Sequence, residues 1–208
     1  MFTEIGYEIQ KQILDQLEAF IGKTDLLVLS DFSYGILSPE MVAKIIKICE
    51  ENKVPYIADS QSSSQLGDIS KFKNSLLLSP TEREAKLALK NNKLGITSTC
   101  SKLMEILDVD NLIVTLGELG VYVQTNNIEG NWKTDEIGAL NKIPIDPAGC
   151  GDSLLITSGL SLVSGANIWE ASYMGSMAAA IQVSRKGNIP INHNELEQLI
   201  EYLVDESP

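Results

Sequence analysis

The sequence predicts an α/β protein built on a mainly parallel β-sheet. Short apolar runs alternate with longer stretches in which apolar residues recur three and four positions apart, which is the pattern of βαβ units. Four of the runs are continuously apolar, as expected for strands that helices cover on both faces. The 208 residues are 44% hydrophobic and 21% charged, which suits a sizeable core and a single domain over residues 1–208.

The first half of the chain supplies most of the expected strands, and one helix with clear start signals lies between the first two. Ser38 is in position to cap that helix and Pro39 to occupy its first turn, with an apolar stripe formed by Met41, Ile45 and Ile48. A further helix is expected to begin at Thr81. The expected strands are 26–30, 55–58, 75–78, 112–115 and 121–124.

The second half is expected to begin with antiparallel pairing and to end in helices. A polar turn at 126–131 precedes an expected edge strand at 140–145. Helices are expected at 151–163 and 168–183, and a last one near Asn192, with Glu195 as its capping partner. Because the helix at 168–183 carries Gly175 and several alanines, another segment should pack close to it.

Charge and composition exclude several classes of partner. Sixteen Lys and Arg stand against 28 Asp and Glu, for a net charge of -12, which argues against nucleic acid or an anionic membrane as the main partner. No run approaches the 18 apolar residues of a membrane span. Three cysteines lie far apart, without metal-ligand spacing, and favour a reducing compartment, so the cytoplasm is the expected location.

Several kinds of catalytic and nucleotide site are also disfavoured. His193 is the sole histidine, which leaves too little for a Ser-His-Asp triad or a multi-histidine zinc site, and we expect it on the surface. There is no G-x-x-x-x-G-K-[ST] loop. Gly149 and Gly151 lack the third glycine of a dinucleotide fingerprint.

The run DPAGCGDS, residues 146–153, carries the strongest chemical signal. Gly149 and Gly151 allow a tight turn that points N–H groups outward, and the following helix adds partial positive charge, so an anion pocket is expected. Asp152 beside that pocket is suited to accept the proton of a hydroxyl that attacks a phosphoryl group. Equally, Asp152 can simply stabilise the helix dipole.

This run resembles the Asp-x-x-Gly-Ala-Gly-Asp signature of the ribokinase-like (PfkB-type) carbohydrate kinases, with Cys150 in place of the usual Ala. The resemblance implies a ribokinase-like three-layer α/β/α fold. It implies that Asp152 is the catalytic base, and that the backbone amides from Ala148 through Gly149 and Cys150 to Gly151 form the anion hole. Some members also hold a monovalent cation, which would lie near Asp146.

Two further segments match the family upstream. Thr115-Leu116-Gly117-Glu118-Leu119-Gly120 resembles its Thr-Leu-Gly-x-x-Gly, which implies that Thr115, Gly117 and Gly120 approach ATP. Pro80-Thr81-Glu82-Arg83-Glu84 resembles its Pro-Asn-x-x-Glu, which implies that Thr81 lies near phosphate and that Glu84 helps to hold Mg2+. Thr81 and Glu84 also have the spacing of a capping box, which needs no ligand.

The stretch 178–187 is similar to the family's Ala-rich helix and turn, which flank adenine, although helix packing explains the same small residues. The segments 29–35 and 58–60 look most like the heptose-7-phosphate kinase branch, with Tyr34 and Gln61 where that branch has lysines. The resemblance maps onto the C-terminal two thirds of a member, so the chain is expected to be N-terminally truncated and its sugar site incomplete.

The resemblance therefore implies an ATP- and Mg2+-dependent kinase of a sugar or sugar phosphate. A homodimer or a partner chain would supply the missing portion and cover the exposed sheet edge, unless the chain's own N-terminal helix covers it. The alternatives are a catalytically silent nucleotide-binding or interaction module derived from such a kinase, and an unrelated α/β protein whose Gly-rich turn binds another anion.

Overall fold

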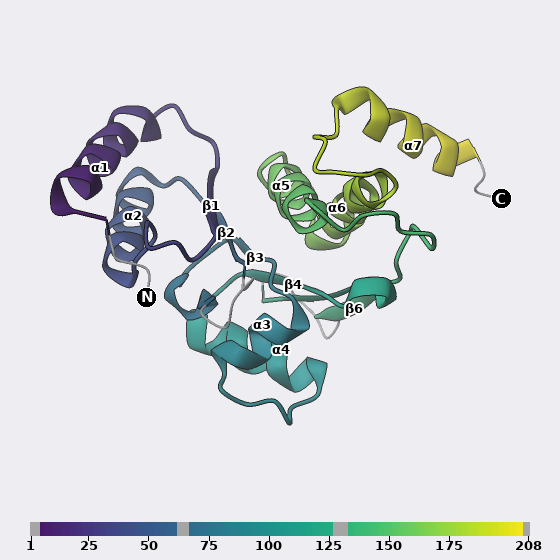
Figure 1. The fold of residues 1–208 in the computed structure, drawn as a ribbon, viewed down its shortest axis with the longest axis horizontal. Coiled ribbons are helices and arrows are strands. Elements are labelled where there is room, and N and C mark those ends of the chain that lie inside the picture. The colour runs from purple at the N-terminus through teal and green to yellow at the C-terminus, as the bar shows by residue number, and fades with distance from the viewer. Residues whose placement is uncertain (1–4, 62–66, 127–132, 206–208) are drawn as a thin grey trace.

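The computed structural model describes residues 5–61, 67–126 and 133–205. They form a six-stranded sheet with helices on both faces (Figure 1). The strands lie in chain order: β1 (Leu27–Asp31), β2 (Tyr56–Ser60), β3 (Leu77–Leu78), β4 (Asn111–Thr115), β5 (Val121–Thr125) and β6 (Thr134–Ile137). The first four are parallel, and β5 and β6 are antiparallel to their neighbours. The predicted mainly parallel sheet is therefore confirmed.

Residues that alternate along the strands divide the core into two clusters. Ala58 of β2 points into the cluster formed with α1 (Tyr7–Ile21), α2 (Pro39–Asn52), α3 (Glu82–Ala88) and α4 (Ile96–Leu107). Ile57 points into the opposite cluster, which includes residues of α5 (Cys150–Val163) and α6 (Ile168–Val183). The result is the expected three-layer arrangement.

The helix signals in the sequence act as predicted. Ser38 Oγ accepts a hydrogen bond from Met41 N–H at the start of α2. Before α7 (His193–Asp205), Asn192 and Glu195 bond each other's backbone amides, as in a capping box. Helix α4 has no predicted counterpart, because its N-cap is Gly95, which offers no capping side chain.

The predicted edge strand at 140–145 is wrong. The outer strand is β6, whose sequence Thr-Asp-Glu-Ile carries little apolar signal. The segment 140–145 is instead fixed to α6, because Asn141 Nδ2 donates to Ala180 O and Ile145 N–H donates to Val183 O. Of the predicted turn at 126–131, residues 127–131 lie outside the described residues.

Close packing of α5 against α6 confirms the prediction made from Gly175. A Cβ at Gly175 would lie 2.8 Å from the backbone oxygen of Leu154 on α5. The contact brings the N-terminal part of α5 against the middle of α6, and so fixes the position of the residues that begin α5.

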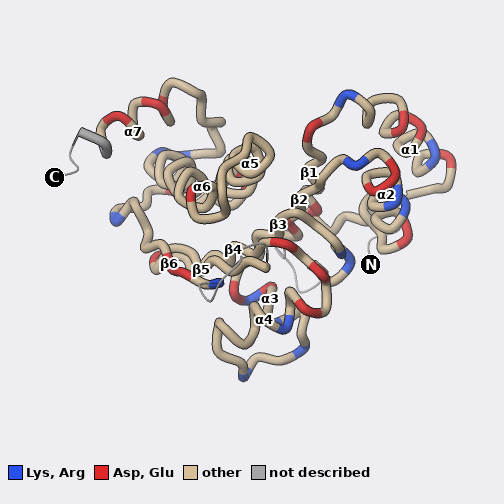
Figure 2. The backbone as a smooth tube through the Cα atoms, turned by 180° about the vertical axis from the view of Figure 1, so that it is seen from behind, with Lys and Arg blue, Asp and Glu red and all other residues tan. Residues whose placement is uncertain are grey.

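The surface agrees with the acidic composition. Acidic residues lie on α1, α2 and α7 (Figure 2). No helix among the described residues combines the length and apolar character that a membrane crossing requires. His193 is exposed, as predicted, and its Nδ1 lies 3.7 Å from Glu197 Oε2.

Candidate active site

The carboxyl ends of the parallel strands gather most of the predicted site residues. Thr81, three residues after the end of β3, forms a parallel bridge with Thr115 at the end of β4, and Thr115 N–H donates to Pro80 O. Asp59 lies near the end of β2. Its pKa is raised in part by Glu84 and Asp152, which places their carboxylates in the same region. The edge where the strands end is where ligands bind in open α/β sheets.

The loop before α5 is held by the side chain of Asp146. Its Oδ1 accepts the Ala148 N–H at 3.0 Å and its Oδ2 accepts the Gly187 N–H at 2.9 Å. These two hydrogen bonds lower the pKa of Asp146. Asp146 thus joins the loop before α5 to the turn after α6.

Glycine is required at position 149. Its φ of +76° is in the left-handed region, and a Cβ there would lie 2.0 Å from Oδ1 of Asn188. The loop therefore lies against the Asn188 side chain, which would have to move if a side chain were added at Gly149.

The loop amides divide into two groups. The Ala148 amide bonds Asp146 Oδ1, and the Cys150 amide bonds Pro147 O at 3.1 Å, so two of the four predicted anion-hole amides already have acceptors within the loop. The amides of Gly149, Gly151 and Asp152 have no hydrogen-bond acceptor among the described residues. These three donors at the start of α5 are the ones left for an anion.

Asp152 lies in the first turn of α5, and its carboxylate makes no hydrogen bond or ion pair with the part of the chain that the structure describes. Burial raises its pKa. A carboxylate with a raised pKa and no partner is a better proton acceptor than a carboxylate held in an ion pair. Its position in the first turn also agrees with the helix-dipole alternative.

Asp59 is a candidate site residue that the sequence reasoning did not select. It is buried, and its pKa is raised to about 7, first by burial, then by the negative charge of Glu84, and further by Asp152 and Asp31. A signal was present, because Asp59 directly follows the continuously apolar run of β2. A buried carboxyl with a strongly raised pKa beside other carboxylates is typical of functional sites.

Glu84 makes the capping box that the sequence allowed as an alternative. Its Oε2 accepts hydrogen bonds from both the backbone N–H and the hydroxyl of Thr81, each at 2.8 Å, and Thr81 Oγ1 accepts from Glu84 N–H. Glu84 is buried close enough to Asp59 to raise its pKa.

The residues present fit Mg2+ held jointly with a ligand. Within the described ranges, no group of three or more His, Cys, Asp or Glu side chains is placed to hold a metal by itself. Mg2+ commonly takes one or two carboxylates and completes its shell with water and substrate phosphates. Asp59 and Glu84 offer hard oxygen donors of this kind, and their mutual repulsion would fall if a cation lay between them.

In the turn after β4, the second glycine, Gly120, is required by the structure. Gly120 has a φ of +100°, and a Cβ there would lie 2.0 Å from the backbone oxygen of Ile137. Gly117, with φ of +62°, has open space around its Cα. The predicted approach of ATP to this turn is therefore sterically open at Gly117, whereas Gly120 is explained by its contact with β6.

The Ala-rich part of α6 packs within the protein. Ala178 is fully buried and Ala179 belongs to the cluster beneath α5 and α6, as the packing alternative expects. One turn further, Gln182 is fully buried and its side-chain amide donates to Ala148 O at 3.0 Å and to Gly187 O at 3.4 Å. Sequence reasoning missed Gln182, since a lone Gln on a helix carries no signal of its own.

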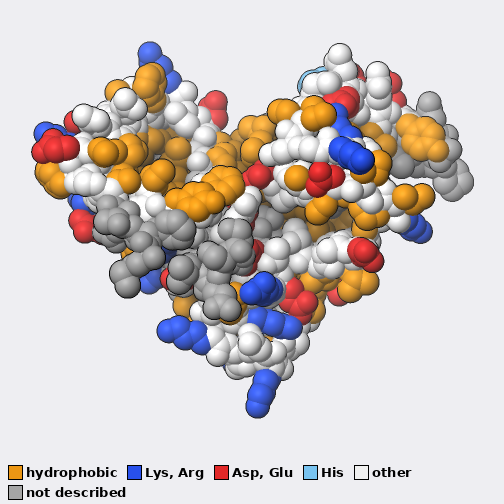
Figure 3. Space-filling model, in the orientation of Figure 1, with side chains coloured by type: hydrophobic (Ala, Val, Ile, Leu, Met, Phe, Trp, Pro, Cys, Tyr) orange, Lys and Arg blue, Asp and Glu red, His pale blue; other side chains and the backbone are white. Residues whose placement is uncertain are grey.

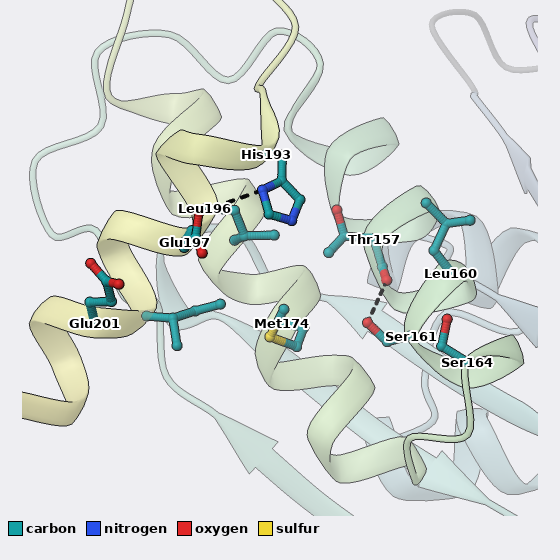
Figure 4. A pocket seen from close by; sticks show the side chains of 10 residues that line it. Thr157, Leu160, Ser161, Ser164, Met174, His193, Leu196, Glu197 and Glu201 are labelled. Atoms are coloured by element: carbon teal, nitrogen blue, oxygen red, sulfur yellow. Dashed lines mark hydrogen bonds and ion pairs between the residues drawn. The ribbon is translucent and has the colours of Figure 1, made fainter.

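A groove of about 690 Å³ lies elsewhere, between α5, α6 and α7 (Figure 4). Thr157, Ser161 and Met174 line it on one side, and His193 and Glu197 lie on α7 opposite them. None of the predicted site residues lines this groove. It is therefore a feature separate from the candidate active site.

The chain is similar in sequence to a family of carbohydrate kinases. The model described as pfkB family carbohydrate kinase matches residues 4–195. The bifunctional protein HldE of Campylobacter concisus is 32% identical over 177 residues, which are 84% of this chain and 35% of that protein. HldE of Campylobacter curvus is 31% identical over 202 residues, 95% of this chain and 41% of that protein. The chain thus spans less than half the length of these relatives.

Solved structures match the fold over a larger share of their length. Phosphofructokinase-2 of Escherichia coli in complex with potassium gives a TM-score of 0.80 at 16% identity, covering 97% of this chain and 64% of that chain. Ribokinase of Thermotoga maritima gives 0.69 at 24% identity, covering 88% and 59%. Arabidopsis thaliana ribokinase complexed with ribose and ATP gives 0.74 at 18% identity, covering 90% and 59%. The fold is ribokinase-like.

Proposed function

Because the chain belongs to the pfkB family of carbohydrate kinases, we propose that it is the nucleotide-binding portion of an enzyme that transfers the γ-phosphoryl group of ATP to a sugar hydroxyl. One observation carries the proposal. The unpartnered carboxylate of Asp152, whose pKa is raised, follows directly after the amides of Gly149 and Gly151, which have no acceptor among the described residues. A proton acceptor and an anion cradle thus share one helix start.

The chain's own residues divide the work of phosphoryl transfer. Asp152 accepts the proton of the attacking hydroxyl on its carboxylate. The amides of Gly149 and Gly151, with that of Asp152, donate to the oxygens of the moving phosphoryl group and offset its charge. Positioning and electrostatics supply most of the rate in such reactions, because the loose transition state needs little covalent help.

The nucleotide lies, in this proposal, along the carboxyl ends of β3 and β4. Thr115 and Gly117 contact ATP, with Thr81 beside them and Gly120 shaping the turn. Mg2+, when bound with the nucleotide, neutralises phosphate charge, and Glu84 and Asp59 would hold it. A monovalent cation near Asp146 belongs to the same proposal, since a solved neighbour, phosphofructokinase-2, is complexed with potassium.

The acceptor is a sugar or sugar phosphate. Heptose 7-phosphate is the first compound to test, because the segments 29–35 and 58–60 resemble the heptose-7-phosphate kinase branch and HldE proteins are among the relatives in sequence. A second copy or a partner chain would complete the acceptor site. A large part of each relative lies outside the region that this chain matches, which supports an acceptor site formed partly by residues that this chain does not contain.

Substitution of Asp152 tests the proposal. Asp152→Asn should retain MgATP binding in a calorimetric titration but lose sugar-dependent release of ADP by at least about a hundredfold, the loss typical when a general base is removed. Asp110→Asn, at an exposed carboxylate before β4, is the matched control. Unchanged turnover in Asp152→Asn would remove the base assignment.

A second candidate function is a silent nucleotide-binding or interaction module. Among the described strands β1 pairs with β2 alone, and the exposed Val28 lies on this edge strand. Leu27 N–H and Asp31 O bond the β2 side, so the peptide groups of Val28 and Ser30 point away from it. Apolar side chains also lie along the notch between the α1–α2 end and the α5–α7 end (Figure 3). MgATP binding without ADP release for any sugar would favour this candidate.

A further inference from the structure

The side chain of Gln182 is placed to orient one peptide group of the anion loop. Gln182 lies near the end of α6 and is fully buried. Its Nε2 donates to Ala148 O at 3.0 Å and to Gly187 O at 3.4 Å. Both partners are carbonyl oxygens, which only accept, so the amide NH2 and not the amide oxygen must face them.

Peptide geometry transmits this contact to the anion-binding side. A trans peptide is planar, and its C=O and N–H bonds point in opposite directions. The carbonyl of Ala148 and the N–H of Gly149 belong to one peptide. Because Gln182 holds the Ala148 carbonyl toward the protein interior, the Gly149 N–H must point away from it, and this N–H has no acceptor among the described residues.

Neighbouring contacts hold the rest of the loop but leave this peptide to Gln182. Asp146 Oδ1 bonds Ala148 N–H and Pro147 O bonds Cys150 N–H, which fix the peptides on either side. Because glycine has no Cβ, residue 149 does not by itself restrict rotation of the Ala148–Gly149 peptide. Gln182 supplies the restraint, and its second bond ties the loop to Gly187 after α6.

We infer that Gln182 is a positioning residue, which aims the Gly149 N–H at the phosphoryl group by holding the Ala148 carbonyl from behind. The inference rests on the proposed function, because it assigns the Gly149 amide to a phosphate of the nucleotide. Gln182 touches neither substrate nor nucleotide in this role.

The sequence allows this single peptide to be observed directly. Ala-Gly occurs once in the 208 residues, at Ala148-Gly149. Protein labelled with carbonyl-13C alanine and 15N glycine therefore gives one carbonyl-to-amide correlation in an NMR experiment. The 13C shift reports the hydrogen bond to the Ala148 carbonyl, and the amide shift reports whether the Gly149 N–H meets an anion.

Gln182→Met removes the donor while nearly keeping the size of the side chain. We expect its Ala148 carbonyl signal to move from the wild-type position without ligand, and its Gly149 amide to respond less to MgATP. ATP affinity should fall roughly tenfold, which corresponds to the loss of about one hydrogen bond to a charged group. The affinity for adenosine, which has no phosphate, should stay unchanged. Gln182→Asn, which keeps the amide but is too short to reach, should behave like Gln182→Met and serves if that variant folds poorly.

Gln124→Met is the matched control. Gln124 is also a buried glutamine whose amide donates within the protein, to Ser101 Oγ at 3.1 Å, but it lies on β5 away from the loop. The Gln124→Met variant should lose stability without changing the Ala148-Gly149 signal.

A Gln182→Met signal that matches wild type with and without MgATP overturns the inference alone. A wild-type signal that responds to neither MgATP nor inorganic phosphate overturns the proposed function, and the inference with it.

Discussion

The ammonium group of Lys71 lies 2.5 Å from Oδ2 of Asp31, and the two side chains are only 10% and 4% exposed. Lys71 also donates to Leu37 O at 2.7 Å, so it holds both the end of β1 and the start of the helix that follows. Asp31 accepts the Ser33 N–H on its other oxygen. This buried ion pair therefore fixes the β1–α2 loop beside the candidate site.

Removing the cation of this pair should be costly. Lys71→Met leaves the Asp31 carboxylate buried without its counter-charge, and the expected loss in free energy of unfolding is about 3–5 kcal/mol at neutral pH. Urea denaturation of both proteins measures the difference. Lys44→Met is the control, since its partner Glu40 lies on the surface, where solvent screens the pair and its loss should change stability little. Equal losses in the two variants would contradict a special role for Lys71.

The sequence predicted the parallel strands, β5 and the antiparallel pairing well, and the position of the outer strand poorly. Continuous apolar runs such as that of β2 report burial on both faces, and burial is what the sheet requires of them. Strand β6 is largely exposed, so its residues follow no apolar pattern. The ion pair between Asp31 and Lys71 joins positions 40 residues apart, which no local spacing can indicate.

Substitution of Glu84 should separate its role in capping α3 from its proposed role in holding Mg2+. In Glu84→Gln the amide oxygen can still accept the Thr81 N–H, so the free energy of unfolding should change by less than about 1 kcal/mol. The lost negative charge should weaken Mg2+-dependent ATP binding, measured by titrating Mg2+ at fixed ATP. Glu170→Gln, in the exposed capping box of α6, should leave Mg2+ dependence unchanged. If Glu84→Gln needs no more Mg2+ than wild type, the metal assignment fails.

Gly175 should tolerate no larger side chain. A Cβ there would lie 2.1 Å from Ser158 Oγ and 2.8 Å from the Leu154 carbonyl oxygen, and the backbone atom cannot move without shifting α5. Gly175→Ala should therefore lower the free energy of unfolding by about 1–3 kcal/mol, despite the better helix propensity of Ala. Thermal and urea unfolding measure this. Gly95→Ala, which has nothing within 4 Å, is the control, and equal stability of Gly175→Ala and wild type would show that the helices can separate freely.

The motif residues of the site could be predicted from the sequence, because a loop before a helix needs particular residue types. One example is the glycine at position 149, which has a positive φ. The residues that support the motif residues could not be predicted. Gln182 and Asp59 act through neighbours distant in sequence, and single-residue types without spacing carry no prediction. The sequence also could not show which loop amides lack an acceptor. In the structure these are the amides of Gly149 and Gly151, among the described residues.

Asp59 should make stability depend on pH in a definite direction. Its pKa in the folded protein is raised from an ordinary 3.8 to about 7, by burial first and then by Glu84, so between these values the folded state binds more protons than the unfolded state. The contribution of Asp59 is fully present below pH 3.8 and is lost as the pH rises to about 7, by at most about 4 kcal/mol. Asp59→Asn should remove this slope, so that the variant gains stability relative to wild type as the pH rises from 4 to 8. Urea unfolding across this range measures the difference, with Asp110→Asn as the exposed control. A constant difference between Asp59→Asn and wild type at every pH would show that the Asp59 carboxyl titrates alike in both states.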